Sequence, residues 1–344
     1  MSQDRRSAHR AARVVEPGGP VLLAPVEARA PGPGEVRLDV VASGICGADA
    51  GTVADPSPAN GFPVTPGHEV AGVVAELGPD VRGWDIGERA GVGWFGGSCG
   101  SCPACRSGDV VHCPRRRIPG LSYPGGWASS ITVPVNALVH IPDGLTSAEA
   151  APFGCAGVTT FTALRDGGAE PGDRVAVVGI GGLGHLAVQF AAAMGFETVA
   201  VARGEEKRRA ATELGAHHYV DASREDAGRV LRDLGGCRLI LSTASSSEPL
   251  AGLVTGLAPH GRLTVAGLDG TPVRLPLGDL VMHARSVTGH LTGNPVDTEQ
   301  AMRFALAGGV RPHVRTAPLE HVDEALKIQQ AGQARFRMVL LPTA

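Results

Sequence analysis

A glycine-rich stretch between a strand pattern and a helix pattern places the strongest constraint on the fold of this chain. The apolar run RVAVV leads into GIGGLG, and an apolar helical pattern, GHLAVQFAAAMG, follows without a break. A second apolar run, TVAVAR, comes about 20 residues after the glycines, as in strand–helix–strand units. YVDAS, CRLILSTAS and GRLTVAGL continue the alternation. This order predicts a parallel, doubly wound α/β sheet.

The rest of the chain has a different character. Residues 13 to about 150 are rich in Val, Gly and Pro, and turn signals such as PGPGE and GWDIGE separate short alternating runs, which predicts a β-rich domain. The C-terminal segment is mixed and ends in the apolar run FRMVLLP. A length of 344 residues favours two domains. We therefore expect one domain from residues 1–152 and 292–344, with an α/β domain, 153–291, inserted between them.

The glycines of the first turn match a dinucleotide-binding fingerprint. Gly179 permits the tight turn, Gly181 lets the backbone approach a pyrophosphate, and Gly184 lets helix and strand pack closely. Gly182 and Leu183 lie where the helix begins, so its N–H groups face the phosphates. A glycine turn in an α/β domain that binds no nucleotide is the alternative.

The end of the second strand predicts which dinucleotide binds. An NAD enzyme carries Asp or Glu there to hold the ribose 2′-hydroxyl, but this chain has Ala202 followed by Arg203. The Arg203 guanidinium and the Lys207 ammonium would suit a 2′-phosphate, which favours NADP(H). Glu205 and Glu206 stand nearby, and a merely solvated Arg203 is the alternative.

Four of the seven cysteines crowd into GGSCGSCPACRSGDVVHC. Cys99, Cys102, Cys105 and Cys113 have the spacing C-x2-C-x2-C-x7-C, which lets the sulfurs converge on one tetrahedral ion. The four ligands predict a closed, structural zinc site in a cysteine lobe over about residues 93–115. A chance cluster, a redox loop and an iron–sulfur centre are alternatives; zinc is favoured because nothing else indicates electron transfer.

A second metal site is predicted from scattered residues. Cys46 lies in GICGADAG, His68 and Glu69 in TPGHEVAG, and Cys155 in APFGCAGVTT. Two cysteines and one histidine make the ligand set of an open catalytic zinc, with water or substrate in the fourth position. Taken alone, Cys46 or Cys155 is more often a small buried side chain than a ligand, and this interpretation is kept for Cys237.

These motifs together resemble the zinc-dependent medium-chain alcohol dehydrogenases. Cys46, the GHE at 67–69, the cysteine lobe, CAGVTT and GIGGLG occur in the family's order, and the resemblance runs from about residue 14 to 342. It is nearest to a bacterial branch similar to cinnamyl-alcohol and broad primary-alcohol dehydrogenases. It implies an α/β fold class with a GroES-like β-rich catalytic domain, a Rossmann domain, an active-site cleft between them, and a homodimer or homotetramer.

The resemblance also implies residue roles at the catalytic metal. Cys46, His68 and Cys155 correspond to the zinc ligands. Glu69 corresponds to a glutamate that approaches the metal during ligand exchange. Asp49 corresponds to the carboxylate that orients the ligand histidine, and such a partner fixes the tautomer and basicity of the ring.

Further roles implied by the resemblance concern the cofactor and the proton. Thr159 corresponds to a residue near the nicotinamide, and Arg337 to an arginine that reaches the pyrophosphate. The family usually has Ser or Thr two positions after the first cysteine and often a histidine three positions later, which together pass a proton outward. This chain has Ala48 and Gly51 there, so the relay is missing.

Charge and composition exclude other classes. The net charge is −3 with a pI near 6.5, and no basic stripe indicates nucleic acid. We expect neither a membrane span nor a secretory signal, because the basic N-terminus MSQDRRSAHRAARVV has no apolar region after it and is expected to be a short disordered arm. A cytoplasmic location, where thiols stay reduced, is the expectation.

The sequence predicts a zinc-dependent oxidoreductase, with two zinc ions per chain, that transfers hydride between NADP(H) and a small-molecule alcohol/aldehyde pair. A reductase of a conjugated C=C or an iminium is one alternative, since such a product needs no proton on an alkoxide. A non-catalytic nucleotide-binding scaffold is the other, and the intact catalytic ligands argue against it.

Overall fold

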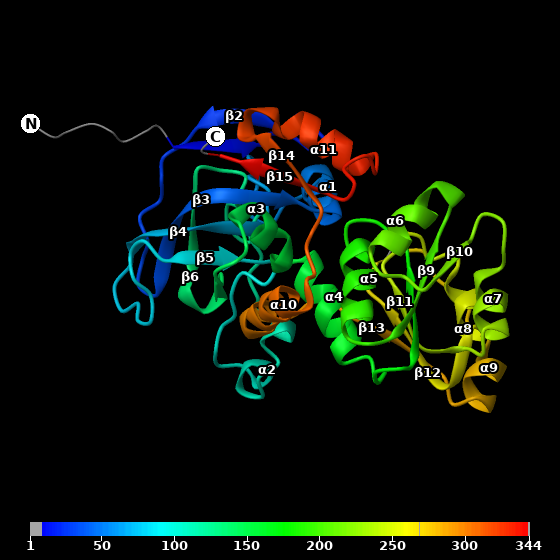
Figure 1. Ribbon diagram of the computed structural model, residues 1–344. Helices are drawn as coiled ribbons and strands as arrows, with labels where there is room; N and C mark the ends of the chain where they lie inside the picture. The colour runs from blue at the N-terminus through cyan, green and yellow to red at the C-terminus, as the bar shows by residue number, and fades with distance from the viewer. Residues whose placement is uncertain (1–8, 268, 343–344) are drawn as a thin grey trace, which may run out of the picture. The chain divides into compact units, whose positions relative to one another are not determined.

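The computed structural model describes residues 9–267 and 269–342 and divides into two compact units (Figure 1). Unit 1 comprises Met1–Cys155, Gly293–Arg303 and Pro312–Ala344, and unit 2 comprises Ala156–Thr292 and Phe304–Arg311. The two units have separate strand systems: a mostly antiparallel sheet in unit 1 and a parallel sheet in unit 2.

The main sheet of unit 1 has the order β14-β15-β3-β4-β5-β7, with β6 paired to β3. Its longest strand, β3, alternates buried and less buried residues, the pattern of a sheet that packs on one face. The strands are β3 Glu35–Ile45, β4 Glu69–Leu77, β5 Arg89–Val92, β6 Ser130–Pro134, β7 Leu138–His140, β14 Val314–Pro318 and β15 Arg337–Leu341.

Short helices and the β1–β2 hairpin, described below, complete unit 1. Most of the helices are a single turn or two, consistent with a domain organised by its sheet. They are α1 Gly47–Ala54, α2 Pro103–Arg106, η1 Val110–His112, η2 Val135–Ala137, α3 Ser147–Ala150, η3 Ala151–Gly154, η5 Leu319–His321 and α11 Val322–Gln330. The longer α10, Pro295–Gly308, has residues in both units.

The N-terminal segment corrects one expectation. Strand β1, Arg10–Arg13, pairs with β2, Leu22–Pro25, and the Ala12 N–H donates to the Trp127 carbonyl at 2.7 Å. Ala11 and Ala12 are buried, so the predicted disordered arm is wrong for these residues: two small apolar side chains and a strand partner order them. Residues 1–8 of that predicted arm lie outside the described residues.

Unit 2 is a six-stranded parallel sheet in the order β10-β9-β8-β11-β12-β13, flanked by helices (Figure 1). The chain reverses direction across the sheet between β8 and β11, the point where open α/β sheets bind ligands. The strands are β8 Arg174–Val178, β9 Glu197–Ala202, β10 His218–Asp221, β11 Cys237–Ser242, β12 Leu257–Val265 and β13 Ser286–Gly289; the helices are α4 Ala156–Arg165, α5 Gly184–Ala193, η4 Glu205–Lys207, α6 Arg208–Glu213, α7 Ala227–Asp233, α8 Leu250–Thr255 and α9 Leu277–Met282.

The units differ from the predicted domains mainly at one segment. Phe304–Arg311 belongs to unit 2, whereas the sequence analysis places 292–344 entirely in the other domain. The reason is packing: the Phe304 ring lies 5.5 Å from that of Phe161 and 6.0 Å from that of Phe190. Within the part of the chain that the structure describes, no helix combines the length and apolar character that a membrane span needs.

Candidate active site

The end of β3 and the start of α1 present the first predicted metal ligand. Cys46 is the N-cap of α1 and is 5% exposed. Asp49, in the first turn of the helix, accepts the Cys46 N–H on Oδ2 at 2.8 Å, so one carboxylate satisfies a free N–H of the helix end. The cysteine and the aspartate are therefore held in one rigid turn.

The same aspartate reaches the predicted histidine ligand. His68 directly precedes β4, and its Nδ1 lies 3.0 Å from Asp49 Oδ1. Both side chains are almost fully buried. The other ring nitrogen, Nε2, is buried and has no hydrogen-bond partner among the described residues. A buried nitrogen oriented this way has the arrangement of a metal-ligating imidazole.

Cys155 completes the ligand set from the end of η3. Its Sγ lies 3.8 Å from Cys46 Sγ. Two thiolates bound to one tetrahedral zinc at about 2.3 Å would have their sulfurs about 3.8 Å apart, so this separation fits a shared ion. Candidate ligand atoms of Cys46, His68, Glu69 and Cys155 all lie within 4.8 Å of one another. The structure thus brings together the residues that the sequence placed far apart.

A close backbone approach sets the position of Cys155. The Trp94 N–H donates to the Gly154 carbonyl at 2.9 Å. A Cβ on Gly93 would lie 2.1 Å from the Gly154 oxygen, so that position requires glycine. The residue before the ligand is thereby fixed against the end of β5, Val92.

Glu69 and Arg337 form a buried ion pair beside the two cysteines. Arg337 Nη2 donates to both carboxylate oxygens of Glu69 at 2.5 Å, and the side chains are 1% and 0% exposed. Burial raises the pKa of Glu69 to about 7 although Arg337 opposes that shift. Arg337 therefore lies with the metal ligands of unit 1, and its predicted contact with a pyrophosphate stays a prediction.

The two thiols have opposite tendencies to ionise. The hydrogen bond with Cys155 lowers the pKa of Cys46, and His68 acts in the same direction. The same hydrogen bond raises the pKa of Cys155, and burial adds to that effect. Burial opposes a charged His68, but Asp49 outweighs it and raises the histidine pKa. Two thiolates and a neutral imidazole are the ligand forms that zinc takes, so metal binding here releases protons.

The four predicted cysteines of the cysteine lobe form a second cluster. The Sγ–Sγ distances are 3.5 Å for Cys102–Cys105, 3.6 Å for Cys113–Cys99, 3.8 Å for Cys102–Cys113 and 3.9 Å for Cys99–Cys105. These are four of the six edges of a tetrahedron that could hold one ion, at about the spacing expected for bound thiolates, and all four sulfurs lie within 4.8 Å of one another. Backbone N–H groups of Cys105 and Arg115 also point to sulfurs, at 3.5 and 3.3 Å. Four sulfur ligands would close the coordination sphere of an ion held here.

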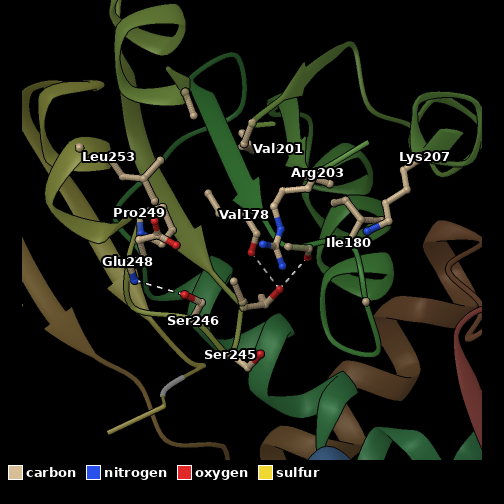
Figure 2. A pocket seen from close by; sticks show the side chains of 18 of the residues that line it. Val178, Ile180, Val201, Arg203, Lys207, Ser245, Ser246, Glu248, Pro249 and Leu253 are labelled. Atoms are coloured by element: carbon tan, nitrogen blue, oxygen red, sulfur yellow. Dashed lines mark hydrogen bonds between the residues drawn. The ribbon is translucent and has the colours of Figure 1, made fainter. Parts of the chain in front are cut away.

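A cavity of about 770 Å³ opens at the carboxyl ends of the unit 2 strands (Figure 2). Among the predicted cofactor residues it is lined by Gly179, Gly181 and Gly182 of the turn, by Ala202 and Arg203 at the end of β9, and by Lys207 of η4. The turn requires glycine at Gly179 and Gly184, whereas Gly181 leaves open space beside the backbone. Gly179 has φ +90°, a Cβ on Gly184 would lie 1.7 Å from the Gly179 oxygen, and a Cβ on Gly181 would meet nothing within 4 Å. Leu183 and Gly184 begin α5.

Figure 2 shows the Arg203 side chain reaching into this cavity, with the Lys207 amino group directed to the same side. Both residues are exposed, and neither has an ion-pair partner among the described residues. Their neighbours differ: Arg208 pairs with Glu205, and Arg209 pairs with Glu213. The two cations that line the cavity are thus available to an anionic ligand.

Several residues of the cavity were missed by sequence reasoning. The Thr243 hydroxyl donates to the carbonyls of Val178 and Gly179, at 3.1 and 2.8 Å, and so holds the glycine turn against β11. Glu225, Asp226 and Glu248 also line the cavity. Figure 2 shows Glu248 well apart from Lys207. Thr243 and Glu248 lie in the run STASSSE, whose sequence gives no indication that their side chains face a ligand.

Thr159 and the first turn of α1 complete the predicted positions. Thr159 is buried in α4 of unit 2, and its hydroxyl donates to Thr292 Oγ1 at 3.1 Å. In α1, Ala48 and Gly51 bring no side-chain donor to the metal cluster. The first hydroxyl of that helix, Thr52, donates to the Ala48 carbonyl at 3.5 Å.

Comparison with known proteins agrees with this geometry. Residues 32–143 match the alcohol dehydrogenase GroES-like domain, and residues 182–307 match the zinc-binding dehydrogenase family. The chain is 39% identical to alcohol dehydrogenase notN of Aspergillus sp. (strain MF297-2) over 94% of this chain and 95% of the relative. The chain belongs to the zinc-type medium-chain alcohol dehydrogenase/reductase family.

Other members of the family support the assignment. NADP-dependent alcohol dehydrogenase C 1 of Mycolicibacterium smegmatis is 34% identical, over 93% of this chain and 94% of the relative. The solved cinnamyl alcohol dehydrogenase of Sorghum bicolor superposes with a TM-score of 0.87 at 28% identity, covering 96% of this chain and 97% of that one. The predicted family, the GroES-like plus Rossmann fold class and the assignment as an NAD(P)-linked alcohol dehydrogenase/reductase are confirmed.

Proposed function

We propose that this family member binds two zinc ions per chain and transfers hydride between NADP(H) and an alcohol/aldehyde pair. The observation that carries the proposal is the convergence of buried Cys46 and His68 with half-buried Cys155, where His68 Nε2 has no hydrogen-bond partner among the described residues. Three protein ligands leave a position for the oxygen of a substrate, whereas the four sulfurs of the cysteine lobe leave none.

When bound, zinc polarises a substrate oxygen as a Lewis acid, and the nicotinamide supplies or accepts hydride. The protein's own residues hold the site in place. Asp49 keeps the His68 ring turned so that Nε2 faces the ligand cluster. Arg337 balances the charge of Glu69 beside the two thiolates, and without it that carboxylate would be buried and unpaired.

The preference for NADP(H) is supported by two cations without an ion-pair partner among the described residues, Arg203 directly after β9 and Lys207 in η4. Arg203 and Lys207 line the cavity, and Ala202 leaves the ribose hydroxyl without an acidic partner on that strand. A charge-assisted hydrogen bond contributes about 1.5–3 kcal/mol, which corresponds to roughly a tenfold or larger preference over NAD(H). One relative is named as NADP-dependent.

The test of this function combines metal analysis with cofactor titration. Elemental analysis should find two zinc ions per chain, and reduction of an aldehyde panel should proceed with NADPH at lower concentration than with NADH. Arg203→Ala should remove the preference. Arg209→Ala is the matched control, because Arg209 is exposed and pairs with Glu213 at 2.7 Å outside the cavity. One zinc or none, or equal affinity of the native protein for the two cofactors, would contradict the respective part of the proposal.

The missing relay favours a second candidate reaction on the same site. With Ala48 and Gly51 in α1, no side chain of that turn can pass a proton to or from a substrate oxygen. A conjugated C=C or an iminium substrate needs no such transfer at oxygen. Faster turnover of such substrates than of simple aldehydes would select this alternative. A homodimer or homotetramer and a cytoplasmic location stay predictions, the first to be checked by light scattering.

A further inference from the structure

The segment that carries Arg203 is tied to the neighbouring strand on both sides. Asp221 ends β10 and is the register partner of Ala202, the last residue of β9. The Ala222 N–H donates to the Ala202 carbonyl at 2.8 Å, and the Gly204 N–H donates to Asp221 Oδ1 at 2.8 Å. The backbone immediately before and after Arg203 is therefore held by the end of β10.

A tyrosine of the same strand fixes the remaining polar group of Gly204. The Tyr219 hydroxyl donates to the Gly204 carbonyl at 2.5 Å, and the tyrosine is only 9% exposed. Gly204 has φ +95°, in the region that favours glycine. A flexible residue in an unusual conformation thus has both of its backbone groups bonded to side chains of β10.

Asp221 does not replace the acid that is missing at the end of β9. Its Oδ1 also accepts the N–H and the hydroxyl of Ser223, at 3.0 and 2.6 Å. The Ser223 hydroxyl and the Gly204 N–H lower the pKa of Asp221, so the carboxylate is ionised when it accepts these bonds. It is 3% exposed and is not among the residues that line the nucleotide cavity. The hydrogen bonds of Asp221 Oδ1 therefore go to Gly204, in the segment after β9, and to Ser223, in the segment after β10.

We propose that Tyr219 and Asp221 are positioning residues for cofactor selectivity. They clamp Gly204 so that the Arg203 side chain, which has no ionic partner among the described residues, stays directed into the cavity to meet a 2′-phosphate. A preorganised contact loses less conformational freedom on binding, so the clamp adds affinity only for the ligand that makes the contact. This inference rests on the proposed preference for NADP(H).

The first test removes one hydroxyl. Tyr219→Phe keeps the ring under the Arg208 guanidinium, 4.9 Å from the ring centroid, and loses only the bond to Gly204. We expect the Kd for NADPH to rise by about 2- to 10-fold, the effect of one hydrogen bond, and the Kd for NADH to stay unchanged. Tyr123→Phe is the matched control, because the Tyr123 hydroxyl also donates to a backbone carbonyl, that of Gly96 at 2.9 Å, but in unit 1.

The second test asks whether a conservative substitution at Asp221 restores cofactor selectivity and whether the effect of Tyr219 depends on Arg203. Asp221→Ala removes the acceptor for Gly204 and should lower the ratio of Kd for NADH to Kd for NADPH. Asp221→Asn keeps an amide oxygen as acceptor and should restore most of that ratio. In an Arg203→Ala background, Tyr219→Phe should not change the ratio further, because the clamp acts through Arg203.

The outcomes separate this inference from the function on which it rests. If the native protein binds NADPH and NADH equally, the proposed preference fails and the clamp has nothing to position. If Arg203→Ala removes a clear preference but Tyr219→Phe leaves it intact, the preference stands and the clamp is overturned. If Tyr219→Phe or Asp221→Ala weakens the binding of NADPH and NADH equally, the residue has a general structural role. If Asp221→Ala weakens only the binding of NADH, Asp221 is a ligand of the ribose. Either result contradicts the inference.

Discussion

The two clusters of metal ligands in unit 1 differ in how far apart their residues lie along the chain. Cys99 and Cys113, the ends of the cysteine lobe cluster, are 14 positions apart. Cys46 and Cys155 are 109 positions apart, and they meet only when β3, α1 and η3 are in place. The cysteine lobe cluster can form within one loop, whereas the cluster of Cys46 and Cys155 forms only when the sheet of unit 1 has formed.

The clusters also differ in what surrounds them. The cluster proposed as catalytic has a buried carboxylate, Asp49, on the histidine and a buried ion pair, Glu69–Arg337, beside the sulfurs. In the described cysteine lobe the sulfurs contact one another, backbone N–H groups and the Ser101 hydroxyl. A closed site built this way stabilises its loop, while the site with charged neighbours and an open position can direct chemistry.

Replacing a ligand of the distant cluster should have the largest effect on activity. Cys46→Ser should lower turnover by roughly 10³-fold or more, because Lewis-acid stabilisation by zinc amounts to several kcal/mol. The protein should stay folded and hold one zinc instead of two. Cys237→Ser is the control, since Cys237 is buried in the core of unit 2, whereas both clusters belong to unit 1. Full activity in Cys46→Ser would contradict the catalytic assignment.

Adding a hydroxyl beside the cluster of Cys46, His68 and Cys155 should have the second largest effect on activity. Ala48→Ser should raise alcohol oxidation near neutral pH by up to about 10²-fold, the lower range of general acid–base catalysis. In the native enzyme we expect this rate to rise with pH, because hydroxide substitutes for the missing relay. Ala50→Ser, about 200° around the same helix, is the control. If the native enzyme and Ala48→Ser show identical pH–rate profiles on one primary alcohol, the missing relay does not limit the reaction.

The partner of the histidine should matter only at the buried cluster. Asp49→Asn should cost about 10–100-fold in zinc affinity or activity, the usual effect of changing a carboxylate behind a metal-bound histidine. Asp109→Asn provides the comparison, because Asp109 contacts His112 at 2.6 Å in the cysteine lobe and both of these side chains are exposed. Chelator competition measures the affinity. Equal effects of the two substitutions would show that burial does not distinguish the sites.

Changing the cysteine lobe should affect activity least. Cys102→Ser should leave kcat per folded molecule close to the native value and lower the Tm, by several degrees for a loss of about 2 kcal/mol. Thermal unfolding with and without added zinc measures this. A loss of turnover in fully folded Cys102→Ser would end the division between a structural and a catalytic cluster.

Local patterns explain which features the sequence predicted. The glycine turn follows from the φ and close packing that it needs, and the cysteine lobe follows from a spacing that needs no distant partner. The N-terminal strand was not foreseen, because the partners of Ala12 include Trp127, more than a hundred residues away. Residues 304–311 join unit 2, unlike in the predicted division, for a similar reason, since Phe304 packs on α4 and α5.

The sequence by itself determined the succession of a β-rich and an α/β region, the GIGGLG turn and the four-cysteine cluster, because each depends on residues close along the chain. The tertiary structure alone decided that Cys46, His68 and Cys155 converge, that Arg337 pairs with Glu69 and that Asp221 lies beside Ala202 in the register. These contacts join residues from separate strands, and only the pairing of those strands fixes which side chains meet.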